Sequence, residues 1–153
     1  MSAPGQVDFA FGAPDRLRTA CQIARKRYLA GDRLLVYCSD GARLTAFDRL
    51  LWAFDDISFI PHVRADDRLA PETPVVLTAS SPEAARAAMG GEAQPWLLNL
   101  DDGCPPGSES FARIMEVVSD DPAERQVARE RWRAYQALGL QLNAHDLGRR
   151  GAS

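Results

Sequence analysis

The apolar residues of this chain gather in short runs that are separated by longer segments of helical period. Four runs have the length of a β-strand, namely residues 7–11, 34–38, 75–78 and 95–100. The run 34–38 is unbroken by polar residues, which is typical of a strand covered on both faces. These runs predict a mostly parallel sheet.

The segments between the runs repeat apolar side chains at the 3.6-residue spacing of a helix. Asp15 is suited to cap the first helix, and Gly31 to end it. The turn Ser39-Asp40-Gly41 leads into the second. The predicted helices cover residues 15–31, 41–54, 82–89, 111–118 and 122–138.

Strands and helices that alternate in this way are typical of α/β proteins, in which crossovers between parallel strands are right-handed. We therefore expect a single three-layer α/β/α domain with a doubly wound, mostly parallel sheet. It would be Rossmann-like without a phosphate-binding loop. The domain is expected to cover residues 1–147, and residues 148–153 are expected to form a flexible tail.

The composition argues against direct binding of nucleic acid and against membrane contact. The chain has 153 residues, of which 46% are hydrophobic and 25% charged, and its formal net charge is −3. Proteins that bind the phosphate backbone of a duplex usually carry a strong basic excess, so nucleic acid is expected to be contacted only indirectly. Neither a signal peptide nor an apolar segment of about 20 residues occurs. A cytoplasmic protein without membrane contact is expected.

The chain offers little chemistry for a metal or a cofactor. Cys21, Cys38 and Cys104 are widely spaced and include no C-x-x-C pair, so they indicate reduced thiols rather than a zinc site or a disulfide framework. His62 and His145 have no nucleophile at a suggestive spacing. We therefore predict no catalytic residue, no metal site and no cofactor.

A nucleotide-binding or enzymatic Rossmann-like domain is the alternative, because open parallel sheets bind ligands at the carboxyl ends of their strands. The first strand-to-helix turn, residues 11–16, contains one glycine, a proline that removes an amide donor, and Asp15 where a phosphate would sit. Neither G-x-G-x-x-G nor G-x-x-x-x-G-K-[ST] occurs. The pattern therefore favours a protein that is not an enzyme.

The predicted helix 41–54 ends with an aromatic residue that its own core does not need. Its apolar arc consists of Leu44, Phe47, Leu50, Leu51 and Phe54. Trp52 points about 100° away from the centre of this arc. Phe59, Ile60 and Pro61 follow it, and together these residues predict a protein-docking surface, because aromatic anchors dominate interface energetics. Packing of Trp52 beneath the following loop is the alternative.

The predicted helix 122–138 offers a second surface. Its predicted buried arc consists of Val127, Ala134 and Leu138. Trp132 lies at the border of this arc beside Arg125 and Arg129, an arrangement that suits a ligand with a carboxylate beside an aromatic ring, such as a peptide carboxy-terminus. A solvated basic face with Trp132 partly buried is the alternative. Arg131 falls toward the apolar arc, and the sequence does not explain it.

In this order and at these spacings, several segments resemble the chi subunit of bacterial DNA polymerase III holoenzyme over nearly the whole chain. The segments that carry the resemblance are Val7-Asp8-Phe9, the helix with Leu17, Cys21 and Ala24, Leu50-Leu51-Trp52, residues 58–62, 96–100, 111–118 and 128–135, and finally Gly139 and His145.

The resemblance implies a nucleotide-binding-like fold without known catalysis and an adaptor of the clamp loader. It implies that Arg125, Arg129 and Trp132 match the positions that bind the C-terminal tail of single-stranded DNA-binding protein. It also implies that Trp52 and Phe59 match positions associated with the psi subunit. A helicase-like repair protein competes for the same surface in that family.

Overall fold

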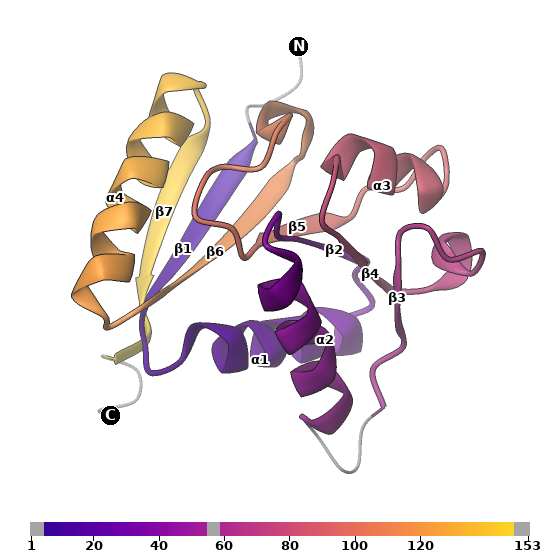
Figure 1. Ribbon diagram of the computed structural model, residues 1–153. Coiled ribbons are helices and arrows are strands. Elements are labelled where there is room, and N and C mark those ends of the chain that lie inside the picture. The colour runs from indigo at the N-terminus through magenta and orange to yellow at the C-terminus, as the bar shows by residue number, and fades with distance from the viewer. Residues whose placement is uncertain (1–4, 55–58, 149–153) are drawn as a thin grey trace.

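The computed structural model describes residues 5–54 and 59–148, and within them it shows a parallel sheet with helices on both faces (Figure 1). The strands are β1 (Gln6–Ala13), β2 (Leu34–Tyr37), β3 (His62–Arg64), β4 (Val75–Thr78), β5 (Trp96–Asn99), β6 (Arg113–Ser119) and β7 (Gln141–Asp146). They lie in the order β3-β4-β2-β5-β6-β1-β7, and every neighbouring pair is parallel. The predicted α/β class is confirmed.

The helices divide between the two faces of the sheet. They are α1 (Arg16–Leu29), α2 (Gly41–Ala53), α3 (Pro82–Ala88) and α4 (Pro122–Ala137), and two short 3-10 turns cover Ala70–Glu72 and Ser108–Ser110. Helices α1 and α2 pack into one apolar cluster, and α3 and α4 pack into another on the opposite face. Among the described residues no helix is both long and apolar enough to cross a membrane.

A short polar side chain caps each of these four helices. Asp15, Asp40, Ser81 and Asp121 all accept hydrogen bonds from backbone N–H groups of the first turn. The predicted N-cap at Asp15 is thus confirmed, with an Oδ1 to Arg18 N distance of 3.1 Å. These caps satisfy amide donors that would otherwise be free at each helix start.

The prediction of a helix over 111–118 is wrong, because most of this segment forms strand β6. It lies between β5 and β1, where Ile114, Val117 and Val118 are buried on alternating faces. A short apolar segment has no period that separates a strand from a buried helix, and β-branched residues favour the strand. The edge strands β3 and β7 were also missed, since β3 has only three residues and β7 is largely polar.

The buried carboxylate of Glu116, in the middle of β6, joins several elements. Its Oε1 accepts a hydrogen bond from Arg131 Nε at 3.0 Å. Its Oε2 accepts from Asn99 Nδ2 at 2.7 Å and from the Tyr135 hydroxyl at 2.6 Å. Every partner is a donor, which is the environment that an ionised carboxylate requires. One side chain therefore links β5, β6 and α4 at the centre of the fold.

This network explains Arg131 and corrects the predicted inner face of α4. The buried residues of the helix are Ala128, Arg131 and Tyr135. Ala134 and Leu138 of the predicted arc are exposed, and Val127 is only partly buried. Burial, and then the charge of Glu116, raise the pKa of Tyr135 above its ordinary range, so its hydroxyl keeps the proton that it donates. The helix turns its buried cation, rather than its apolar residues alone, toward the sheet.

We predict that Arg131→Ala lowers the free energy of unfolding by about 3 kcal/mol, because the buried Glu116 carboxylate loses its hydrogen-bonded cation and keeps only Arg16, whose terminal nitrogen lies 3.9 Å away. Arg133→Ala is the matched control on the same helix. Its side chain is exposed, so the change is expected to stay within about 0.5 kcal/mol. Urea unfolding of both variants measures the difference, and equal midpoints would contradict a structural role for the ion pair.

Candidate functional site

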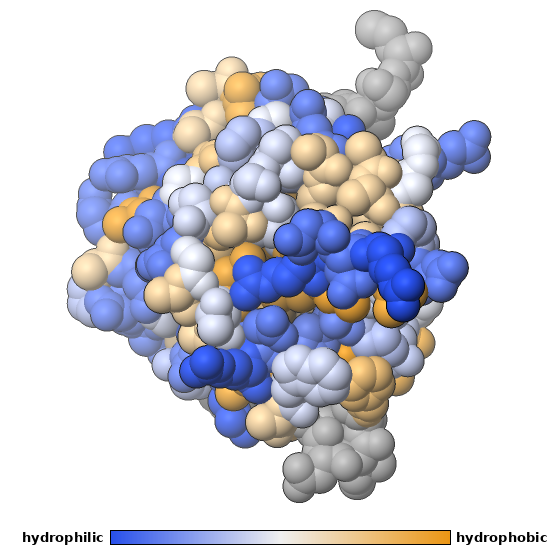
Figure 2. Space-filling model, turned by 45° about the vertical axis from the view of Figure 1, so that its right-hand side comes forward, coloured by the Kyte–Doolittle hydropathy of each residue, from blue (hydrophilic) through white to orange (hydrophobic). Residues whose placement is uncertain are grey.

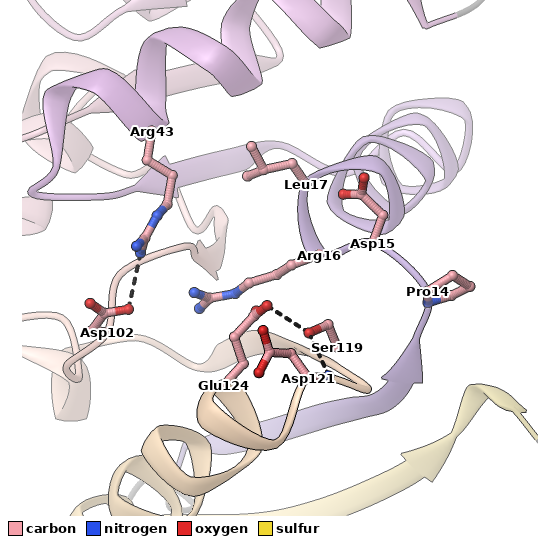
Figure 3. A pocket seen from close by; sticks show the side chains of 9 residues that line it. All are labelled: Pro14, Asp15, Arg16, Leu17, Arg43, Asp102, Ser119, Asp121 and Glu124. Carbon is pink, nitrogen blue, oxygen red and sulfur yellow. Dashed lines mark hydrogen bonds and ion pairs between the residues drawn. The ribbon is translucent and has the colours of Figure 1, made fainter.

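The carboxyl edge of the sheet holds a cavity of about 530 Å³, at the place where a Rossmann-like protein would bind a ligand (Figure 3). It lies where α1, α2 and α4 begin. Its lining residues are Pro14, Asp15, Arg16, Leu17, Arg43, Asp102, Ser119, Asp121 and Glu124.

The charges of this cavity do not suit a phosphate. Both of its cations are already engaged by the protein. Arg16 donates to the carbonyls of Val117 and Asp101 at 3.0 and 2.9 Å, and Arg43 donates to Leu100 O and to Asp102. Burial, and then the nearby charge of Arg131, lower the pKa of Arg16.

The helix starts that face the cavity are occupied as well. Asp15 and Asp121 line it and cap α1 and α4, so part of the amide set that would bind an anion is already used. Glu124 adds a carboxylate, which accepts a hydrogen bond from the Ser119 hydroxyl at 2.6 Å. No group of three potential metal ligands occurs in residues 5–54 and 59–148. The chemistry of this edge therefore gives no support to the nucleotide-binding alternative.

The cysteines play no part in a reactive site. Cys21 and Cys38 are buried, Cys104 is partly buried, and all are free. Burial raises the pKa of Cys21 to about 12 and that of Cys104 to about 11. These thiols remain protonated at neutral pH and act as small apolar side chains.

A second cavity, of about 240 Å³, lies between α4 and the β1–β7 end of the sheet, and we call it the α4 pocket. It is lined by Phe9, Phe11, Val118, Arg125, Ala128, Arg129, Trp132 and Ala144. The structure thus brings together the three residues that the sequence predicted for this surface. Its walls are mostly apolar, and its two cations are exposed.

The apolar wall of the α4 pocket is held in place by ring packing. Trp132 lies against Phe9 with ring centroids 5.1 Å apart and planes tilted by 55°. Phe11, two residues further along β1, is 40% exposed. Among the described residues, neither Arg125 nor Arg129 donates a side-chain hydrogen bond or forms an ion pair. The pocket can therefore hold an apolar group while two guanidinium groups meet an anion.

The strand residues of this pocket were missed at the sequence level. Phe9 and Phe11 are two residues apart on β1 and so share a face, and this spacing could have indicated that both belong to one surface. Ala144 belongs to β7, a strand that the sequence did not predict, so its place in the wall of the pocket could not be foreseen.

The second predicted surface lies at the end of α2, on the other face of the sheet, and we call it the aromatic surface. Trp52 is 57% exposed and Phe59 is 59% exposed, with ring centroids 4.9 Å apart. The prediction that Trp52 lies outside the core is confirmed. Across the face shown in Figure 2, hydrophobic and hydrophilic residues are interspersed.

The remaining residues predicted for the aromatic surface behave differently. Ile60 is 2% exposed and belongs to the apolar cluster under α1 and α2, so its assignment to the contact surface is wrong. Pro61 is partly buried. Residues 55–58, between Trp52 and Phe59, lie outside the described part, as do residues 149–153 of the predicted tail.

Comparisons with protein families and with individual proteins all match the chain to one family. Residues 5–143 match the family described as DNA polymerase III chi subunit, HolC. The chain is 34% identical to the DNA polymerase III subunit chi of Pseudomonas aeruginosa over 134 residues, which cover 88% of each chain. It is 28% identical to the protein of that name from Escherichia coli, with 80% of each chain covered. The identity to that of Haemophilus influenzae is 26%, over 84% of this chain and 85% of the relative.

We predict that the carboxyl-edge cavity binds no nucleotide, because its cations are engaged and its helix starts are capped by carboxylates. Equilibrium dialysis with labelled ATP and GTP at millimolar concentration is expected to show no saturable uptake. Saturable binding that Arg16→Ala abolishes would contradict this account of the cavity.

Proposed function

The chain belongs to the chi subunit family of DNA polymerase III, an accessory rather than a catalytic subunit of that replication enzyme, and on this premise we propose that it is an adaptor. In this proposal one surface holds the psi subunit of the clamp loader. The other holds the C-terminal tail of single-stranded DNA-binding protein. The adaptor thereby links the polymerase to protein-coated single-stranded DNA.

The observation that carries the proposal is the composition of the α4 pocket. The tail that it would bind has apolar last residues and a free terminal carboxylate. The apolar end would lie against Phe9 and Trp132, and the carboxylate would meet Arg129 or Arg125 at the rim. Arg129 lies one helical turn from both Arg125 and Trp132, which makes it the central cation of the site.

The aromatic surface suits the psi subunit. Two large rings that are more than half exposed and packed against each other are typical of interface anchors. The surface is formed by the end of α2 and the segment before β3, whereas the α4 pocket lies on the opposite face of the sheet. The two partners would therefore not compete. A helicase-like repair protein that docks on the same rings would compete with psi.

We predict that Trp52→Ala or Phe59→Ala weakens psi binding by about 2 kcal/mol or more, because each removes a central anchor. The free energy of unfolding should change little, since both rings are largely exposed. Leu69→Ala is the matched control, an exposed apolar side chain outside the aromatic surface. Calorimetric titration with psi gives the affinities. If Trp52→Ala lowers the melting temperature markedly, the residue is core and the assignment is wrong.

We predict that Arg129→Ala weakens binding of the tail peptide about tenfold or more, because a hydrogen bond between charged groups is worth about 1.5–3 kcal/mol. Arg125→Ala should have a smaller effect, and Trp132→Ala should remove the apolar wall. Arg133→Ala, with the same charge on the same helix but outside the pocket, should bind normally. Calorimetric titration measures all four variants.

Amidation of the peptide's terminal carboxylate tests the same charge pair from the other side. It should weaken binding to the native chain about as much as Arg129→Ala does, and the two changes together should cost little more than either alone. If Arg129→Ala and the native chain lose affinity equally on amidation, the carboxylate is bound elsewhere and the pocket assignment fails.

A further inference from the structure

The aromatic surface continues inward to a buried histidine. The ring of His62 lies 4.7 Å from the Trp52 ring, centroid to centroid, with the planes tilted by 54°. Phe59 packs on Trp52 as well, so three rings are in sequential contact from the surface to the interior. The side chain of His62 is only 2% exposed. It supports Trp52 without being reachable by a partner.

Both ring nitrogens of His62 face oxygen acceptors. Nδ1 lies 2.8 Å from the carbonyl oxygen of Ile60, and Nε2 lies 2.8 Å from Asp48 Oδ1. A neutral imidazole carries one N–H and can donate to only one of them. A carbonyl never donates, and an ionised carboxylate only accepts. Both contacts are hydrogen bonds only when the ring carries two protons.

The contact with Asp48 also fixes the position of His62 relative to α2. Asp48 and Trp52 are four residues apart on this helix and so share one face. His62 meets both of them, and thereby fastens the start of β3 to the last turns of α2. The two halves of the aromatic surface, Trp52 on the helix and Phe59 before the strand, are joined through this contact.

In residues 5–54 and 59–148, the charged groups that contact His62 or its partner Asp48 come from two elements. Asp48 is contributed by α2, and Arg64 by β3. Arg64 Nε lies 3.8 Å from Asp48 Oδ2, and its terminal nitrogen donates to Thr45 Oγ1 at 3.2 Å. Asp48 therefore contacts His62 through one carboxylate oxygen and Arg64 through the other.

We propose that doubly protonated His62 is the positioning residue of the aromatic surface and that binding of its partner weakens as this proton is lost. The identity of the partner as psi rests on the proposed function, whereas the role of His62 toward Trp52 does not.

Fluorescence of the isolated chain tests the first step. The fluorescence of Trp52 is obtained by subtracting the emission of the Trp52→Phe variant from that of the native chain. A protonated imidazole packed against an indole ring quenches this fluorescence. This difference should rise as the pH is raised from 5 to 8.5, and it should be independent of pH in His62→Gln. His145→Gln is the matched control, since the chain has two histidines, and should keep the change. A flat difference in the native chain, or a change that persists in His62→Gln, would overturn the proposal.

Psi binding at two pH values tests the second step. Loss of one charge-assisted hydrogen bond should weaken binding about tenfold between pH 6 and pH 8.5 in the native chain and in His145→Gln. His62→Gln should bind weakly at both pH values. Psi binding of the native chain that does not change with pH would overturn the proposal. If psi does not bind at any pH, the proposed contact between psi and the aromatic surface is wrong. The fluorescence titration still decides the role of His62.

Discussion

The buried ion pair between Glu116 and Arg131 is the constraint on which the rest of the structure depends. A carboxylate in the middle of a central strand is costly to bury unless every lone pair meets a donor. Here Asn99, Arg131 and Tyr135 supply those donors from the neighbouring strand and from α4. The arrangement fixes the rotation of α4 about its own axis, and with it which side chains of the helix point outward.

The two proposed surfaces follow from this rotation and from the topology. With Arg131 and Tyr135 turned inward, Arg125, Arg129 and Trp132 lie along the border between helix and strand, where β1 and β7 complete a pocket. Helix α2 packs on the other face and ends with Trp52 exposed. Meanwhile the protein's own carboxylates and arginines occupy the edge at which open α/β sheets commonly bind nucleotides. In the proposed account, partners therefore bind at the two flanks of the sheet and not at the strand ends.

The fold class and three of the eight residues that line the α4 pocket could be predicted from the sequence, for identifiable reasons. Runs such as 34–38 are long and apolar enough to indicate buried strands, and Trp52 departs clearly from its helical stripe. The inner face of α4 could not be predicted, because its period is completed by an arginine whose partner lies 15 residues earlier in the chain. Nor could the segment 111–118 be assigned to a strand, because only its neighbours β5 and β1 decide its conformation. Contacts between distant segments, rather than local propensity, determine these features.

The central claim is that one chain holds two partners at once through independent surfaces. Its most direct test is the affinity of the single-stranded DNA-binding protein tail peptide, measured calorimetrically for the free chain and for the chain saturated with psi. The account predicts equal dissociation constants within about twofold, since sites without shared contacts are nearly additive, and a complex that contains all three components by native mass spectrometry. Displacement of the peptide by psi would contradict it.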